Sequence, residues 1–208
     1  MPTTEFKAGD VIFRPGDTYD YCYMVISGLA SVFVYDGQGV VRRIMPIGKY
    51  EFFPSSIGGL GTKKLTRNYA AYTDMVCVKF GKAELDALKQ NPDALYEVTL
   101  AMSKLVDEAK ARIETLIHPK AETKILFLFK YFLDIASEPT EYHDLFAVSY
   151  KNLSHERTGA TLGLTRETAG KEIAKLMDKD ILYLQAKRYV INKPKLMAAI
   201  KPAANKSK

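Results

Sequence analysis

The stretch 159-GATLGLTRETAGKEIAKLM-177 places a tight turn between two segments with helical spacing. Gly163 suits the turn, because glycine adopts the left-handed backbone conformation at little cost, and Thr165 is a good N-cap for the helix that follows. The residues expected to pack the two helices together are apolar: Leu162, Leu164, Ala169, Ile173, Leu176 and Met177. The spacing therefore predicts a helix-turn-helix, with Gly170 and Lys171 on the outside of its second helix.

The segments on either side of this pair complete a small domain. Ser154 is placed to cap the first helix, and residues 121–136 form an apolar helix that ends at Glu138-Pro139. After the pair, 181-ILYLQAKRYVI-191 predicts two short strands around a basic turn. Two helices followed by a β-hairpin predict a C-terminal winged helix-turn-helix over residues 119–208.

The first part of the chain has a different pattern. From residue 6 to about 80, short apolar runs alternate with glycine-containing turns, and Asp36-Gly37-Gln38-Gly39 predicts a hairpin. Such spacing is typical of an antiparallel β-roll of the double-stranded β-helix or jelly-roll type, here assigned to residues 1–90. The whole chain is therefore predicted to have an α+β fold.

A long helix is predicted between these two domains, over residues 91–118. Asn91 is a good cap, Pro92 suits the first helical position, and His118-Pro119 ends the helix. One row of residues recurs at alternating spacings of three and four: Leu95, Val98, Met102, Leu105, Ala109, Arg112 and Leu116. This row favours the seam of a two-stranded coiled coil, hence a dimerisation helix. Packing of the same row against the β-roll is the alternative.

The net charge of +6 is concentrated near the C-terminus. Residues 148–208 carry 13 Lys and Arg against 5 Asp and Glu, whereas residues 1–147 carry 17 against 19. A basic C-terminal domain on a near-neutral larger domain favours a polyanionic partner, most simply nucleic acid. A solvated tail containing Lys201, Lys206 and Lys208 would explain only part of the excess.

Composition and sequence motifs argue against several other classes of protein. No apolar run approaches the roughly 20 residues that cross a bilayer, and the N-terminus does not resemble a secretory signal, so a cytoplasmic location without membrane partners is expected. Cys22 and Cys77 are too few for a disulfide scaffold or a four-thiolate cluster, and free thiols on strands are expected. No catalytic grouping, metal-ligand spacing or phosphate loop is present, so neither an enzyme nor a metal or cofactor site is predicted.

Two sets of motifs carry a resemblance to a known family. The pieces 9-GDVIFRPGD-17 and 23-YMVISGLASVF-33, followed by 154-SHERTGATLGLTRETAGKEIAKL-176, resemble the signatures of the CRP/FNR transcription regulators, a bacterial family. The resemblance extends from about residue 6 to residue 197. It implies a homodimer that binds double-stranded DNA at an inverted-repeat operator under the control of a small-molecule effector, with RNA polymerase as a further partner. A ligand-binding module of cyclic-nucleotide type, whose basic tail is incidental, is the rival interpretation.

The resemblance and the chemistry of the residues assign roles at the second helix. Arg166 can pair bidentately with guanine, Glu167 can accept a hydrogen bond from a cytosine amine, and Lys171 lies one turn further along. The alternative is that these charged side chains only lie in solvent at the start of the helix and contact no base. Contacts to the DNA backbone are expected from hydroxyl-bearing or basic residues: Ser154, His155, Thr165, Thr168, Lys187 and Arg188.

The effector segment departs from the family pattern. Relatives that bind cyclic AMP carry a Gly-Glu pair where this chain has Phe52-Phe53, and an Arg-Ser pair where it has Arg67-Asn68. A phenyl ring cannot accept a hydrogen bond from a ribose hydroxyl, so cyclic AMP is disfavoured. The expected pocket, suited to a flat organic anion, contains Phe53, Arg67, Asn68, Tyr69, Tyr72, Ala109 and Lys110. Burial of these rings in the core is the alternative.

Haem-based and redox-sensing members of the family form the other functional alternative. Haem would need an axial His or Cys in the effector segment, but His118, His143 and His155 lie outside the β-roll. A four-cysteine cluster is excluded by the number of cysteines.

Overall fold

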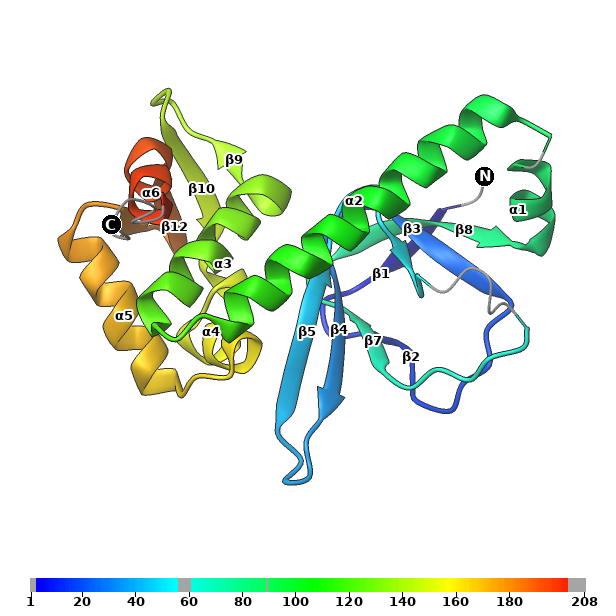
Figure 1. Cartoon of the computed structure of the whole chain (residues 1–208), viewed down its shortest axis with the longest axis horizontal. Coiled ribbons are helices and arrows are strands. Elements are labelled where there is room, and N and C mark those ends of the chain that lie inside the picture. Colours follow the sequence, from blue (N-terminus) through cyan, green and yellow to red (C-terminus); the bar gives the residue numbers. More distant parts are fainter. Residues whose placement is uncertain (1–2, 56–60, 89, 202–208) are drawn as a thin grey trace, which may run out of the picture. The chain divides into compact units, whose positions relative to one another are not determined.

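The computed structural model describes residues 3–55, 61–88 and 90–201, with only the backbone of Met45 (Figure 1). Lys206 and Lys208 of the basic tail lie outside the described residues. The chain divides into two compact units, Met1–Arg112 and Ile113–Lys208, and the division falls within the long helix that was predicted as a separate part.

The first unit contains two antiparallel four-stranded sheets, which confirms the predicted β-roll. The first sheet has the order β1-β8-β3-β6, made by β1 (Thr3–Phe6), β8 (Met75–Gly81), β3 (Tyr21–Ser27) and β6 (Phe52–Phe53). The second has the order β2-β7-β4-β5, made by β2 (Val11–Phe13), β7 (Asn68–Ala71), β4 (Ala30–Tyr35) and β5 (Val41–Ile47). Since neighbouring strands in each sheet are mostly distant in the sequence, the roll is held together by long-range pairing.

Aromatic side chains fill the interior of the roll. Phe13 lies within 6.4 Å, centroid to centroid, of the rings of Tyr19, Tyr21, Tyr23 and Tyr69. Burial of large rings is the main stabilising contribution available to a unit of this size. The two cysteines are also fully buried, as free thiols on β3 and β8, in agreement with the prediction. Burial raises the pKa of Cys22 to about 11 and that of Cys77 to about 12, so both thiols stay protonated and unreactive.

The β4–β5 hairpin has the predicted turn. The Asp36 carboxylate accepts hydrogen bonds from the backbone N–H groups of Gln38 (3.0 Å) and Val40 (2.9 Å). Gly39 has a φ of +78°, a conformation that favours glycine. The strands on either side pair with Tyr35 opposite Val41, so the turn directly sets the register of the hairpin.

Two helices follow the roll: α1 (Lys82–Leu88) and α2 (Pro92–Ile117). The start of α2 is as predicted, because Asn91 Oδ1 accepts a hydrogen bond from the N–H of Ala94 at 3.0 Å. Its end is also as predicted, directly before His118-Pro119.

The row on α2 that was predicted to form a dimer seam is partly covered by the β-roll of the same chain. Val98, Met102, Leu105 and Ala109 are half-buried within this one chain, and Met102 packs on the cluster that contains Phe52. Arg112 Nε donates to the carbonyl oxygen of Ile44 at 3.2 Å. Leu95 and Leu116 at the ends of this row are exposed, and the dimer seam stays a prediction.

A second row, one position further along α2, is the exposed one. It keeps the alternating spacing of three and four and consists of Tyr96, Thr99, Ser103, Val106, Lys110, Ile113 and Ile117. Two adjacent rows thus have the same period. Because periodicity fixes the spacing but not the direction in which a row faces, the sequence pattern could not distinguish the half-buried row from the exposed one.

The second unit is a winged helix-turn-helix, as predicted. Its helices are α3 (Ala121–Ala136), α4 (His155–Leu162), α5 (Arg166–Asp178) and α6 (Lys193–Ile200). Its sheet has the order β11-β12-β10-β9, made by β11 (Leu182–Gln185), β12 (Arg188–Asn192), β10 (Leu145–Ser149) and β9 (Glu138–Pro139). The predicted end of α3 and the predicted β11–β12 hairpin are confirmed. The sequence analysis missed β9, β10 and α6, although Asn192 caps α6 through the N–H of Lys195.

No described helix combines the length and the apolar character that crossing a membrane requires.

Candidate functional sites

The helix-turn-helix is fixed by local hydrogen bonds. Ser154 Oγ accepts from the N–H of Arg157 at 3.3 Å, and Thr165 Oγ1 accepts from the N–H of Thr168 at 3.1 Å. Gly163 has a φ of +67° between the two helices. The predicted caps and turn are therefore confirmed. The hydroxyl groups of Thr165 and Thr168 also share a hydrogen bond of 2.9 Å, so both take part in the cap itself.

The two faces of α5 differ as predicted. Ala169, Ile173 and Leu176 are buried in the second unit, whereas Arg166, Glu167 and Lys171 are exposed. A hydrogen bond from its own backbone N–H, and a further one with Thr165, lower the pKa of Glu167, so this side chain is an acceptor. The start of α5 thus presents two cations and one carboxylate, the donor and acceptor types that recognise base edges.

Gly170 does not lie on the outside of α5, contrary to the prediction. A Cβ atom at this position would lie only 2.9 Å from Nδ1 of His155, and both residues are half-buried. The His155 ring therefore packs between α4 and α5. The amphipathic pattern alone could not reveal this contact, since a glycine carries no side chain to classify.

The two wing residues that were predicted to contact the DNA backbone differ in their surroundings. Lys187 is exposed at the tip of the β11–β12 hairpin, where Ala186 and Lys187 have φ values of +48° and +59°. Arg188 Nη1 instead donates to Glu138 Oε2 at 2.7 Å. Lys187 is thus directly available to a phosphate, whereas Arg188 is engaged with a carboxylate.

A cavity of about 90 Å³ lies within the first unit and contains part of the predicted effector pocket. Its lining is apolar except for three residues and consists of Val32, Ile44, Ile47, Phe52, Ser55, Arg67, Tyr69 and Leu105. Arg67 and Tyr69 are hydrogen-bonded through their side chains; burial raises the pKa of Tyr69, and the Arg67 guanidinium partly opposes this rise. The cavity is therefore lined by one cation and two hydroxyl-bearing side chains among apolar walls.

The other five residues predicted for this pocket do not line it. Phe53 is fully buried in the core, where its ring stacks on Tyr69 at 6.2 Å and 18°. Asn68 and Tyr72 are also buried, and the guanidinium of Arg43 lies 5.1 Å from the Tyr72 ring. Ala109 is half-buried on α2, and the exposed Lys110 pairs with Asp107 at 3.2 Å. The alternative that the rings form core is therefore correct for Phe53 and Tyr72. The lining residues that the sequence did not reveal are Val32, Ile44, Ile47, Phe52, Ser55 and Leu105.

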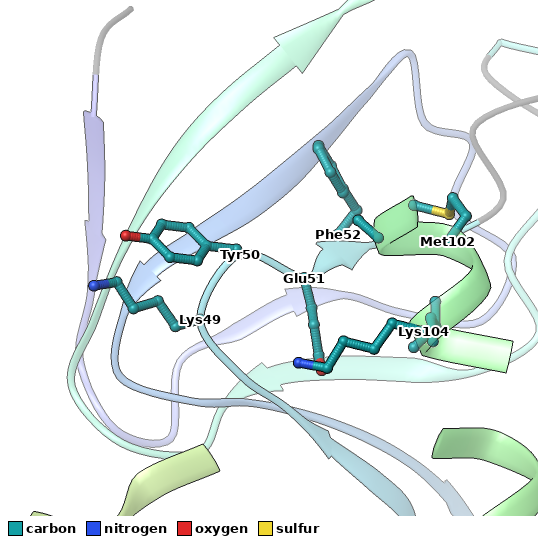
Figure 2. A pocket seen from close by; sticks show the side chains of 8 residues that line it. Lys49, Tyr50, Glu51, Phe52, Met102 and Lys104 are labelled. Atoms are coloured by element: carbon teal, nitrogen blue, oxygen red, sulfur yellow. The ribbon is translucent and has the colours of Figure 1, made fainter. Parts of the chain in front are cut away.

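A second cavity, of about 110 Å³, lies between the loop before β6 and α2, both in the first unit (Figure 2). The loop contributes Lys49, Tyr50 and Glu51, and α2 contributes Met102 and Lys104 among others. Among the described residues, no group of three or more His, Cys, Asp or Glu side chains is arranged to hold a metal ion.

Glu51 is the titratable group of this second cavity. Burial, together with a hydrogen bond to Glu108 and the charge of Glu108, raises the pKa of Glu51 to about 7. Glu51 Oε2 also accepts a hydrogen bond from the N–H of Gly48 at 2.7 Å. Glu108 pairs on its other side with Lys104 at 3.5 Å. Two carboxyl groups in hydrogen-bond contact require a shared proton, so this cluster binds a proton near neutral pH.

Comparison with known proteins finds similarity to both units of the chain. Residues 3–91 match the cyclic nucleotide-binding domain family. The chain is 29% identical over 181 residues to the transcriptional regulator SdrP of Thermus thermophilus, covering 84% of this chain and 81% of that protein. It is 26% identical over 192 residues to the transcriptional activator protein FnrL of Cereibacter sphaeroides, covering 89% and 74%. The crystal structure of a CRP/FNR-family regulator from Thermus thermophilus superposes with a TM-score of 0.77 at 20% identity, covering 97% of this chain and 99% of that one.

A β-roll that matches the cyclic nucleotide-binding domain family therefore precedes a winged helix-turn-helix in this chain. The chain has the fold of a CRP/FNR-family regulator and is similar over most of its length to transcriptional regulators.

Proposed function

We propose that this chain is a transcriptional regulator of the CRP/FNR type that binds DNA sequence-specifically through the start of α5. The observation that carries the proposal is the exposure of Arg166, Glu167 and Lys171 on a capped helix whose opposite face is buried. A helix that enters the major groove by its N-terminal end presents these residues to base edges first. Lys187 at the tip of the wing is the corresponding candidate for a phosphate contact.

Selection from random double-stranded DNA with the full chain tests this function. The expected result is an inverted repeat with half-site centres about 10 bp apart, because two recognition helices related by a two-fold axis lie about one DNA turn from each other. Recovery of a single asymmetric half-site, or of no enriched sequence, would contradict the proposal.

The dimer that such an operator requires is proposed to form through the exposed row of α2. Tyr96, Val106, Ile113 and Ile117 supply the apolar positions of this row. Thr99, Ser103 and Lys110 interrupt it with polar positions, which in coiled coils specify register at a cost in stability. In the row first predicted as the seam, Met102 packs on the roll of the same chain and Arg112 donates to the carbonyl oxygen of Ile44.

The effector is proposed to be a small organic monoanion bound in the cavity that contains Arg67. Its guanidinium can form a charge-assisted pair with a carboxylate, while Val32, Ile44 and Ile47 accept an apolar body. A cavity of about 90 Å³ is smaller than the roughly 150 Å³ cavity that holds benzene in an apolar protein core, so the ligand has few heavy atoms.

Cyclic AMP does not suit this site. No carboxylate lines the Arg67 cavity to accept a hydrogen bond from a ribose hydroxyl, and Phe53 is buried in the core. The cavity is also far smaller than the several hundred Å³ typical of sites for larger ligands.

Calorimetry with short aliphatic and aromatic monocarboxylates tests the ligand class. Binding is expected to weaken at least tenfold in Arg67→Gln and to be unchanged in Lys49→Gln, a cation of the second cavity. Equal binding by Arg67→Gln and the native chain would rule out this site. Micromolar binding of cyclic AMP that also raises operator affinity would overturn the assignment of the ligand.

A further inference from the structure

The contact between His155 and Gly170 involves neither the base-reading residues nor the wing residue of the proposed function. Gly170 lies in the interior of α5, where glycine is a poor helix former. A methyl group there would approach His155 Nδ1 to 2.9 Å and Cε1 to 3.3 Å. The glycine therefore leaves space for the imidazole ring, and the ring lies directly against the backbone of α5.

The His155 ring is also held from its other side by an aromatic chain. Its centroid lies 6.3 Å from that of Tyr150, which precedes α4, in an edge-to-face arrangement. Tyr150 lies 5.4 Å from Tyr189 of β12, and Tyr189 lies 5.2 Å from Phe129 of α3. Phe129 and Tyr189 are fully buried. Four rings thus run from α3 through the sheet to the middle of α5, all within the second unit.

We propose that His155 is a positioning residue that fixes how α5 is presented to DNA, and that the ring acts through its contact with Gly170 rather than by binding a phosphate. The proposal rests on the function proposed above for α5. Interiors are close-packed and deform little, so a ring wedged between the two helices sets their separation. The Phe129–Tyr189–Tyr150 chain restricts the ring from moving away.

A double-mutant cycle on stability tests the contact without DNA. Gly170→Ala alone is expected to lower the melting temperature, because the new methyl group meets the His155 ring. In a His155→Ala background, the same change is expected to raise the melting temperature, because the space is then free and alanine is the better helix former. Equal shifts in both backgrounds would overturn the proposed contact, whatever the protein binds.

DNA selection tests the positioning role. His155→Ala is expected to broaden the preference at the base pairs read from the start of α5, because the helix is no longer held in one position. His155→Gln keeps a hydrogen-bond donor but lacks the ring, so it should broaden the preference equally. Lys187→Ala, a matched change at the tip of the wing, should weaken all sequences alike and leave the preference intact.

The outcomes separate this inference from the proposed function. If His155→Gln restores native binding while His155→Ala weakens all sequences alike, His155 is a phosphate contact and the positioning role is wrong. If the native chain selects no sequence, the proposed function fails, while the stability cycle still decides whether His155 and Gly170 are coupled.

Discussion

Arg188 Nη1 donates a hydrogen bond of 2.7 Å to Glu138 Oε2, which links the wing strand β12 to the edge strand β9 across β10. Both side chains are more than half exposed, so the pair contributes only about 0–1 kcal/mol to stability. Its larger consequence concerns DNA. A phosphate that approaches Arg188 must compete with the carboxylate of Glu138.

Glu138→Gln should therefore raise affinity for DNA of any sequence by roughly threefold to fivefold, since removal of one nearby like charge is worth up to about 1 kcal/mol at the surface. The preferred sequence should stay the same, as should the melting temperature. Asp134→Asn is the matched control, because it removes the same charge from the exposed Lys130–Asp134 pair on α3. Fluorescence anisotropy with specific and scrambled duplexes provides the measurement. An equal gain in both variants would show that only net charge matters.

Arg166→Ala should cost about 1–3 kcal/mol per half-site against the preferred operator and relax the preference at one G·C pair, because a bidentate base contact carries sequence information. Lys187→Ala should weaken preferred and scrambled DNA alike and reduce the salt dependence by about one counterion per subunit. Selection of random DNA and salt titrations measure the two effects. If Arg166→Ala retains the native sequence preference, base reading has been assigned to the wrong residue.

Val106→Glu and Leu105→Glu should separate the two rows of α2. Val106 is 53% exposed, so a charge there should leave the melting temperature of the first unit nearly unchanged and convert dimers to monomers. Leu105 is half-buried and lines both cavities, so a charge there should lower stability by roughly 2 kcal/mol or more. Sedimentation and thermal unfolding distinguish these outcomes. Dimers that survive Val106→Glu would count against the exposed row.

The stability of the first unit should fall as the pH rises from about 4.5 to about 7. Burial and the Glu108 carboxyl raise the pKa of Glu51 from 4.5 to about 7, so between these values the folded state binds a proton that the unfolded state has lost. The stabilising contribution is complete below pH 4.5 and is lost as the pH passes 7, an effect on the order of 2 kcal/mol.

Glu51→Gln is the variant for this test, because a neutral amide can donate to Glu108 at every pH. It should remove most of this pH dependence and be more stable than the native chain above pH 7. Thermal unfolding between pH 4.5 and 8 measures both effects. Glu97→Gln, an exposed change on α2, should leave the native profile unchanged. An unchanged profile in Glu51→Gln would show that another group binds the proton.

Features that depend on neighbours within a few residues could be predicted from the sequence. The caps at Asn91, Ser154 and Thr165 each join a side chain to a backbone N–H three residues later, so a short stretch contains both partners. The left-handed turn at Gly163 is equally local. These signals were sufficient to delimit α2, α4 and α5.

Features that depend on contacts between distant segments could not be predicted in this way. Phe53 was expected to line a pocket because it lies in the effector segment, but pairing of β6 with β3 brings it into the core. The direction of the Leu105 row depends on the position of the roll beside α2. The burial of Gly170 depends on the ring of His155, which lies 15 positions earlier in the sequence.

The two rows of α2 also make the helix intolerant of changes in its length. Consecutive residues point about 100° apart, which is the angle between the rows. A single residue inserted near Thr99 would move Lys104 into the place of Leu105 and turn Leu105 into that of Val106. A single deletion would bring Ser103 and Val106 to the roll. Relatives with substitutions in α2 can therefore keep both surfaces, whereas a relative whose α2 differs by one residue must rebuild both together.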